Sequence, residues 1–246
     1  MESLPVPSVQ AMAGVSPADA VGGDGEAAIP IIDFERLLHP EACGDESARL
    51  HGACQEWGFF QLINHGVPDD VMEGMKANVQ GFFGLPSETK QQFAQERGQL
   101  EGYGQLFVPP QHRNMRFWTD KPDTFRSTLD AYSAAVKNVA DRLLGIMSRN
   151  LGLHPEVIAN KCIIQSVRMN YYPPCAEADK VVGFSPHSDA DLLTLVLQVN
   201  EVQELLLVER EEEMTPKYKT LDHHSFMRLF FSAKLEGKSF LKGMEL

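Results

Sequence analysis

Apolar residues recur every three or four positions in several stretches of the first 160 residues, and this spacing is typical of amphipathic helices. It predicts four helices, over residues 45–57, 68–83, 87–96 and 125–151. Two short runs rich in β-branched and aromatic residues predict strands at 29–34 and 59–64. The front of the chain is therefore predicted to be a helical unit that contains two strands.

Beyond Pro155 the pattern changes to short runs that favour strands over helices, at 163–172, 181–184, 192–199 and 202–208. A charged, turn-like run follows from Glu209, and the apolar positions after Lys217 return to helical spacing. The class is therefore α+β. The predicted divisions are a flexible arm over 1–28, a helical lobe over 29–160, a block of strands over 161–208, and a linker with a C-terminal helix over 209–246.

Amino-acid composition and net charge disfavour several classes of protein. With 43% hydrophobic and 23% charged residues the chain has a globular balance, and its net charge of −12 disfavours binding to nucleic acid. The longest apolar run, at 192–199, is too short to span a membrane, and the first residues lack the pattern of a signal peptide. The cysteines lack the spacing of a disulfide framework or zinc site, so we expect reduced thiols and a cytoplasmic location; they are Cys43, Cys54, Cys162 and Cys175.

Metal ligands are the first chemistry to consider in a chain with eight histidines. A His-x-Asp/Glu triplet places an imidazole and a carboxylate on one side of a strand, as two members of a facial iron triad require. Three triplets occur, and about one is expected by chance from 34 acidic residues in 246. His39-Pro-Glu41 and His154-Pro-Glu156 contain proline and are expected to be polar surface residues near helix ends. His187-Ser-Asp189 leads into the most apolar predicted strand, and by itself suits a metal site and an ordinary polar pair about equally.

A second motif, Asn170-Tyr-Tyr-Pro-Pro-Cys175, lies one predicted strand earlier. Tyrosines are common in strands and Pro-Pro commonly ends one, so the motif has a purely structural interpretation. An amide beside two phenols also supplies hydrogen bonds for a small polar ligand next to a metal. If Asn170-Tyr-Tyr binds such a ligand, His187-Ser-Asp189 is better explained as a metal site than as an ordinary polar pair.

With these motifs the chain resembles the plant Fe(II)/2-oxoglutarate-dependent dioxygenases. The similar blocks follow the family's order through most of the chain. They are Val6–Gln10, Ile29–Asp33, Trp57–Val67, Phe82–Pro86, Glu101–Gln105, Arg168–Cys175, Pro186–Thr194, Tyr218–Thr220 and Lys234–Ser239.

The resemblance implies a double-stranded β-helix, or jelly roll, with a helical N-terminal lobe. It implies that His187 and Asp189 bind Fe(II), and that Tyr172, with Asn170, contacts 2-oxoglutarate. It also implies ascorbate as reductant, and hydroxylation, desaturation or demethylation of a small specialised metabolite while 2-oxoglutarate is converted to succinate and CO2. No residue is assigned as a catalytic base. His65 falls in a block that implies core packing in the lobe.

The chain departs from the family pattern after Asp189. The family has a second iron-binding histidine downstream and then an Arg-x-Ser that binds the far carboxylate of 2-oxoglutarate. Here the later histidines, His223 and His224, fall in the block similar to the family's C-terminal helix, and neither Arg210 nor Arg228 begins an Arg-x-Ser. Four predicted strands are also half of the eight a jelly roll needs.

A smaller departure follows Leu106, where the family has a segment with a Trp-Ala-Asp-like motif. Two internal losses between good matches indicate exon skipping or a faulty gene model. We expect the losses to leave the segments 192–199 and 202–208 with unpaired edges.

Three functional hypotheses follow. The first is a 2-oxoglutarate- and Fe(II)-dependent oxidoreductase by descent, impaired in this chain. The second is an inactive truncated isoform that acts, if at all, as a binding or regulatory protein. In the third, His223 or His224 replaces the missing iron ligand. The sequence indicates a small-molecule substrate and no particular oligomeric state.

Overall fold

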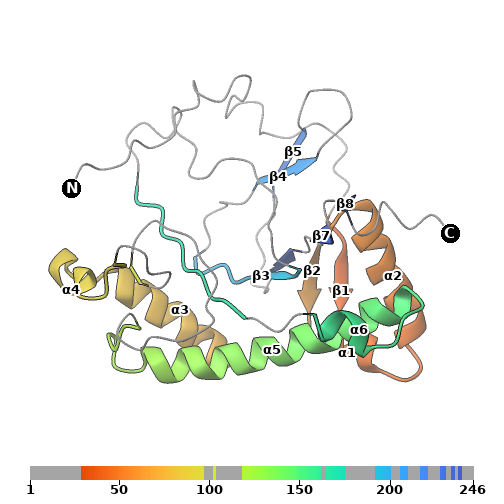
Figure 1. The fold of residues 1–246 in the computed structure, drawn as a ribbon, viewed down its shortest axis with the longest axis horizontal. Helices are drawn as coiled ribbons and strands as arrows, with labels where there is room; N and C mark the ends of the chain where they lie inside the picture. The colour runs from red at the N-terminus through yellow and green to blue at the C-terminus, as the bar shows by residue number, and fades with distance from the viewer. Residues whose placement is uncertain are drawn as a thin grey trace.

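The computed structural model of the chain describes residues 29–96, 102–103, 118–161, 165–174 and 192–200, and the backbone of five short strands between 206 and 239. Helix α5 (Phe125–Asn150) runs along the base of the molecule in Figure 1. Helices α3 and α4 lie toward one end of α5, and α1, α2 and α6 lie toward the other end, beside the first strands. The remaining helices are α1 (Phe34–Leu38), α2 (Cys43–Glu56), α3 (Asp69–Phe83), α4 (Ser87–Gln91) and α6 (Glu156–Ala159).

The long predicted helices are confirmed, and residues at their ends explain their limits. Helix α2 stops before Gly58, whose φ of 68° is left-handed and whose N–H donates to the Ala53 carbonyl. Pro68 and Pro86 immediately precede α3 and α4, where a missing N–H costs nothing. Helix α4 is shorter than the predicted helix over 87–96, and the short helices α1 and α6 were not predicted.

The core lies between the helices and the first two strands. Helix α5 supplies the largest share of it, and Leu143 and Leu144 are fully buried. At the α3–α5 contact the buried amide of Asn78 donates to the Gly74 carbonyl (2.8 Å) and to Thr128 Oγ1 (3.1 Å), and it accepts a hydrogen bond from Thr124 Oγ1 (3.0 Å). A buried polar group is tolerated when its hydrogen bonds are made, so Asn78 fixes how the two helices pack.

The strands form one mixed sheet and two hairpins. Strand β1 (Ile31–Asp33) pairs in parallel with β2 (Phe59–Ile63). Strand β6 (Arg228–Phe230) lies antiparallel between β2 and β3 (Thr194–Val196), so the order is β1-β2-β6-β3. The hairpins join β4 (Leu206–Glu209) to β5 (Lys217–Thr220) and β7 (Lys234–Leu235) to β8 (Lys238–Ser239).

The predicted C-terminal helix is wrong wherever the structure describes residues 209–246, because β5 to β8 occupy those positions. The reason is pairing across the chain. Leu229 lies opposite Phe60 of β2 on one side and opposite Leu195 of β3 on the other. Two ladders of backbone hydrogen bonds outweigh a local helical pattern that has no packed partner.

The other strand predictions have mixed outcomes. Strands β3 and β4 confirm part of the segments 192–199 and 202–208, and each has one paired edge. The predicted strand over 163–172 is wrong for 165–172, which carry no strand pairing. The arm over 1–28 and the strand at 181–184 lie outside the described residues.

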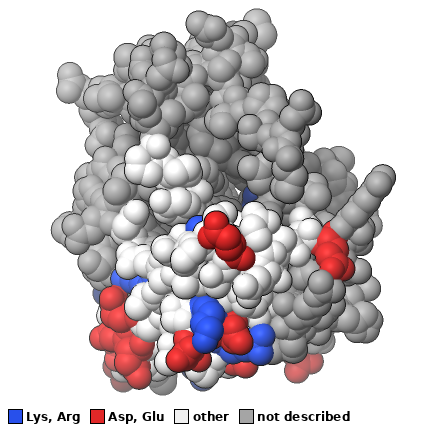
Figure 2. Space-filling model, turned by 90° about the vertical axis from the view of Figure 1, so that its left-hand side faces the viewer, with Lys and Arg blue, Asp and Glu red and all other residues white. Residues whose placement is uncertain are grey.

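Charged residues at the surface form short local pairs. On the face in Figure 2, basic side chains lie next to acidic ones and uncharged surface separates the charged groups. Pairs of this kind include Lys76–Glu73 (2.8 Å) and Lys137–Asp141 (2.6 Å). Exposed pairs of this type contribute little to stability. Among the described residues, none of the helices combines the length and apolar character needed to cross a bilayer.

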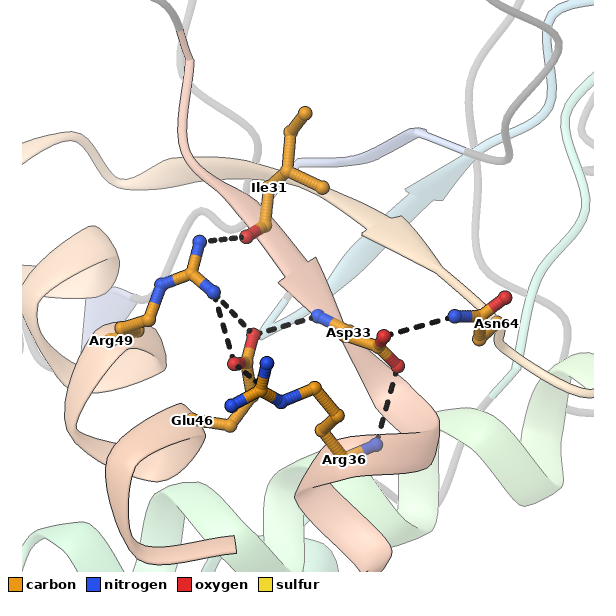
Figure 3. Close-up of polar contacts among 6 residues, drawn as sticks. All are labelled: Ile31, Asp33, Arg36, Glu46, Arg49 and Asn64. Carbon is orange, nitrogen blue, oxygen red and sulfur yellow. Dashed lines mark hydrogen bonds and ion pairs between the residues drawn. The ribbon is translucent and has the colours of Figure 1, made fainter. Parts of the chain in front are cut away.

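One carboxylate is different, because Glu46 of α2 is fully buried (Figure 3). It accepts the Asp33 backbone N–H (2.8 Å) and both its oxygens contact Arg49 Nη1 (3.0 and 3.2 Å). Arg36 Nε lies 3.6 Å away, and Arg49 Nη2 donates to the Ile31 carbonyl (2.7 Å). A buried charge is stable only when it is paired in this way, and the network joins β1, α1 and α2.

We expect Glu46→Gln to lower the free energy of unfolding by about 2 to 3 kcal/mol, because the amide keeps the shape but loses the charge that two guanidinium groups face. Urea unfolding followed by circular dichroism measures this. Glu73→Gln is the matched control, since Glu73 is 70% exposed in its ion pair, and should cost less than about 0.5 kcal/mol. Equal losses in the two variants would contradict the structural role of Glu46.

The two described cysteines should differ in reactivity. Burial raises the pKa of the Cys54 thiol to about 12, whereas Cys43 is only half-buried. Because the thiolate is the reactive form, iodoacetamide at pH 8 should alkylate Cys43 well before Cys54 in the native protein, and at similar rates after denaturation. Peptide mass spectrometry over a time course measures both. Rapid native labelling of Cys54 would contradict its burial.

Candidate co-substrate and metal site

The segment 165–174 follows α6 and crosses the helical lobe without joining a sheet (Figure 1). Three of its odd-numbered residues contact the lobe. Gln165 Nε2 donates to the Ser133 carbonyl of α5 (2.9 Å), and Met169 packs against the core. The Tyr171 ring stacks on the Phe83 ring at the end of α3, with the centroids 5.1 Å apart and the planes 19° apart.

The even-numbered residues of this segment are all exposed. Arg168, Asn170 and Tyr172 are among them, and Tyr172 is 43% exposed. Val167 (42%), Tyr171 (56%) and Pro173 are exposed at odd positions as well, so only Gln165 and Met169 of this segment are partly buried. The structure therefore leaves both predicted co-substrate residues, Asn170 and Tyr172, exposed.

Asn170 has one contact that the sequence analysis did not assign. Its side-chain oxygen accepts a hydrogen bond from Arg168 Nε (3.1 Å). Within the described residues its amide N–H groups have no partner, so they remain donors for a ligand. The i, i+2 spacing of Arg168 and Asn170 in an extended segment was the signal that would have found this contact.

The chemistry of these groups suits a carboxylate. A phenol O–H, an amide N–H2 and a guanidinium all donate hydrogen bonds to anionic oxygen. The pair formed by Tyr172 and Asn170 therefore fits the oxygen-rich ends of a keto acid such as 2-oxoglutarate.

The predicted iron ligands, His187 and Asp189, lie outside the described residues. Where the chain is described, no three His, Cys, Asp or Glu side chains lie together as a metal site requires. The assignment of His187 and Asp189 as an imidazole and a carboxylate ligand therefore stays a prediction from the motif.

The other two His-x-Glu triplets have the structural role expected of them. His39 Nδ1 accepts the Glu41 backbone N–H (3.3 Å) at the end of α1, and His154 Nδ1 accepts the Glu156 N–H (3.5 Å) at the start of α6. Each imidazole thus supports a turn.

His65 is also occupied within the lobe. Its Nδ1 accepts the Val67 backbone N–H (3.1 Å), and burial lowers its pKa while the charge of Asp69 opposes that change. These contacts agree with a packing role.

Two family models match the chain. Residues 29–134 match the N-terminal domain described as "non-haem dioxygenase in morphine synthesis", and residues 163–228 match the 2OG-Fe(II) oxygenase superfamily. The first match covers most of the described helical lobe. The second covers the segment 165–174, the His187-Ser-Asp189 motif and strands β3, β4 and β5, and it ends at Arg228, the first residue of β6.

Curated relatives agree with these matches. The chain is 41% identical to 2-oxoglutarate-dependent dioxygenase 11 of Oryza sativa, over 82% of this chain and 68% of the relative. It is 44% identical to oxoglutarate-dependent flavonoid 7-O-demethylase 1 of Ocimum basilicum, over 72% of this chain and 53% of the relative. Identity to S-norcoclaurine synthase 1 of Coptis japonica is 39%, over 87% of this chain and 70% of that protein.

The fold agrees as well. The crystal structure of JOX2 in complex with 2OG, Fe and JA superimposes with a TM-score of 0.64 at 25% identity, covering 93% of this chain and 73% of JOX2. Similarity in sequence and in fold confirms the resemblance found in the motifs. The chain belongs to the plant 2-oxoglutarate- and Fe(II)-dependent dioxygenases.

Proposed function

We propose that this chain is, by descent, an oxidoreductase of small specialised metabolites that keeps part of the iron and 2-oxoglutarate site and is impaired in turnover. One observation carries the impairment. After Asp189 the 246 residues contain no Arg-x-Ser, and their only histidines are the adjacent pair His223 and His224.

In this proposal His187 and Asp189 hold Fe(II) through an imidazole and a carboxylate, which are two of the three donors of a facial triad. Bound iron supplies the oxidation chemistry of the family, and ascorbate serves as reductant. Tyr172 and Asn170 bind 2-oxoglutarate. The exposure of both side chains supports this assignment.

The missing Arg-x-Ser affects the far carboxylate of 2-oxoglutarate. A guanidinium binds a carboxylate through two parallel hydrogen bonds, which a lysine does not reproduce. Without that group the co-substrate is held mainly at its keto-acid end, and we expect weak binding in a poorly fixed orientation.

Internal shortening of the chain agrees with this view. The alignment to the rice relative is 241 positions long, but only 82% of this 246-residue chain takes part in it. The remaining positions are residues of the relative, inside the matched region, that this chain lacks. The losses inferred from the motifs, after Leu106 and after Asp189, also lie inside the matched region.

The second candidate function is a catalytically inactive isoform that acts by binding. The same missing residues favour it. It differs from the first in predicting that metal and 2-oxoglutarate have no measurable affinity for the chain.

The iron centre can be tested by anaerobic titration of the protein with Fe(II) and 2-oxoglutarate. We expect no metal-to-ligand charge-transfer band and no succinate on admission of O2, because a two-donor site does not hold iron and keto acid in the geometry that turnover requires. A clear band with succinate formation would contradict the impairment.

Weak metal binding is measured separately, from the loss of the free Mn(II) signal in electron paramagnetic resonance. We expect His187→Ala to abolish it and His154→Ala to leave it unchanged, since His154 supports a turn before α6. A double His223→Ala/His224→Ala variant that also abolishes binding would favour a third ligand from that pair.

Tyr172 should contribute directly to binding of 2-oxoglutarate. We expect Tyr172→Phe to weaken binding about 3- to 10-fold, through loss of one hydrogen bond to a charged group. Saturation-transfer NMR of 2-oxoglutarate with Mg(II) present measures the affinity. Tyr103→Phe is the control, because the Tyr103 ring packs in the aromatic cluster around Phe82. No binding to the wild-type chain would favour the inactive isoform.

A further inference from the structure

The stacked pair of Phe83 and Tyr171 is the aromatic contact described between the segment 165–174 and the helical lobe. Phe83 is the last residue of α3 and is itself held in place. Its carbonyl accepts a hydrogen bond from Lys90 Nζ (2.8 Å), and its ring meets Phe82 edge to face at 5.4 Å. Phe82 in turn contacts the rings of Phe93 and Phe125. Phe83 therefore presents a fixed ring face to the segment.

Tyr171 lies between Asn170 and Tyr172 in the sequence, so the stack affects the orientation of both neighbouring side chains. Side chains of an extended backbone alternate, so a residue held against the lobe turns both of its neighbours to the opposite side. Tyr172 precedes Pro173, which restricts it to extended conformations and prevents a helical turn from breaking the alternation.

The other contacts fix the segment less firmly. Gln165 makes one hydrogen bond to the Ser133 carbonyl, five residues before Asn170, and Met169 packs without directional bonds. A flat ring stacked on a flat ring restricts both the distance and the rotation of the segment. Within the described residues the backbone of 165–174 also lacks the ladder of a sheet, which would otherwise set its orientation.

We propose that Phe83 of the helical lobe is a positioning residue for the segment 165–174: by stacking on Tyr171, it turns the neighbouring side chains, Asn170 and Tyr172, away from the lobe. The 2-oxoglutarate role of these two residues rests on the proposed function, whereas their orientation by Phe83 does not. Phe83 touches no ligand in this proposal and acts only through Tyr171.

Four variants separate the ring stack from general packing. Phe83→Leu and Tyr171→Leu each remove one ring of the stack, from opposite sides. Phe83→Tyr and Tyr171→Phe keep both rings and should behave as the wild type. Tyr171 is 56% exposed, so Tyr171→Leu tests the stack without disturbing the core even if Phe83→Leu unfolds the lobe. Phe93→Leu removes another ring of the Phe82 cluster and controls for loss of packing.

The first readout is the NMR signal of the Tyr172 ring in protein labelled with ¹³C-tyrosine. The chain has five tyrosines, and the signal that disappears in Tyr172→Phe identifies residue 172. We expect both Leu variants at the stack to move this signal toward its value in the unfolded chain. The ring-keeping variants and Phe93→Leu should leave it in place.

The second readout is the affinity for 2-oxoglutarate with Mg(II) present. We expect a loss of about 3- to 10-fold in Phe83→Leu and Tyr171→Leu, and none in the ring-keeping variants. An unmoved Tyr172 signal in both Leu variants, or an equal effect of Phe93→Leu, overturns the inference. A moved signal in a chain that does not bind 2-oxoglutarate overturns the co-substrate assignment and supports orientation by Phe83.

Discussion

The buried carboxylate of Glu46 is the constraint on which the arrangement of the lobe depends. A charge with no exposed surface is stable only if its partners come to it, and here they come from three elements: the Asp33 N–H of β1, Arg36 of α1 and Arg49 of α2. Asp33 also accepts hydrogen bonds from the Arg36 N–H and the Asn64 amide, which adds the end of β2 (Figure 3). One charge therefore fixes the edge of the sheet against the helices.

The sheet and helix α5 extend this constraint toward the site. Strand β2 pairs with β6, and β6 pairs with β3, so the strand that follows the predicted iron motif is connected to the lobe through two ladders. Helix α5 is joined to α2 by the hydrogen bond from the Asn150 amide to the Ser47 carbonyl (2.9 Å), and it accepts Gln165 at Ser133. The co-substrate segment is thus oriented by helices of the lobe.

Sequence reasoning succeeded where local pattern and local packing agree. The stripes of α3 and α5 predicted their burial, and the prolines and Gly58 marked where helices begin and end. It failed at β6, because Leu229 pairs with residues about 170 and 34 positions away and no local pattern encodes those partners. Short helices such as α1 were missed because five residues are too few for a period to be visible.

In the candidate site, too, some features were predicted from the sequence and others were not. The motif singled out Asn170 and Tyr172, and both are exposed in the structure, whereas the strand predicted to carry them is absent at 165–172. In place of a ladder, Met169 packs against the core of the lobe and Tyr171 stacks on Phe83. The Arg168–Asn170 hydrogen bond and the Phe83–Tyr171 stack were not predicted, since one needs side-chain geometry and the other joins residues 88 positions apart.

The positions of these groups along the chain explain how a shortened member of the family could retain part of the site. The groups assigned to 2-oxoglutarate precede the larger of the two predicted losses, and the contacts of their segment with the lobe come from α3 and α5. The groups that close the iron centre and bind the far carboxylate come from later strands in the family pattern. In the proposed function, binding and turnover therefore depend on different parts of the chain: the lobe holds the segment 165–174, and loss of the later part would remove the geometry for oxidation.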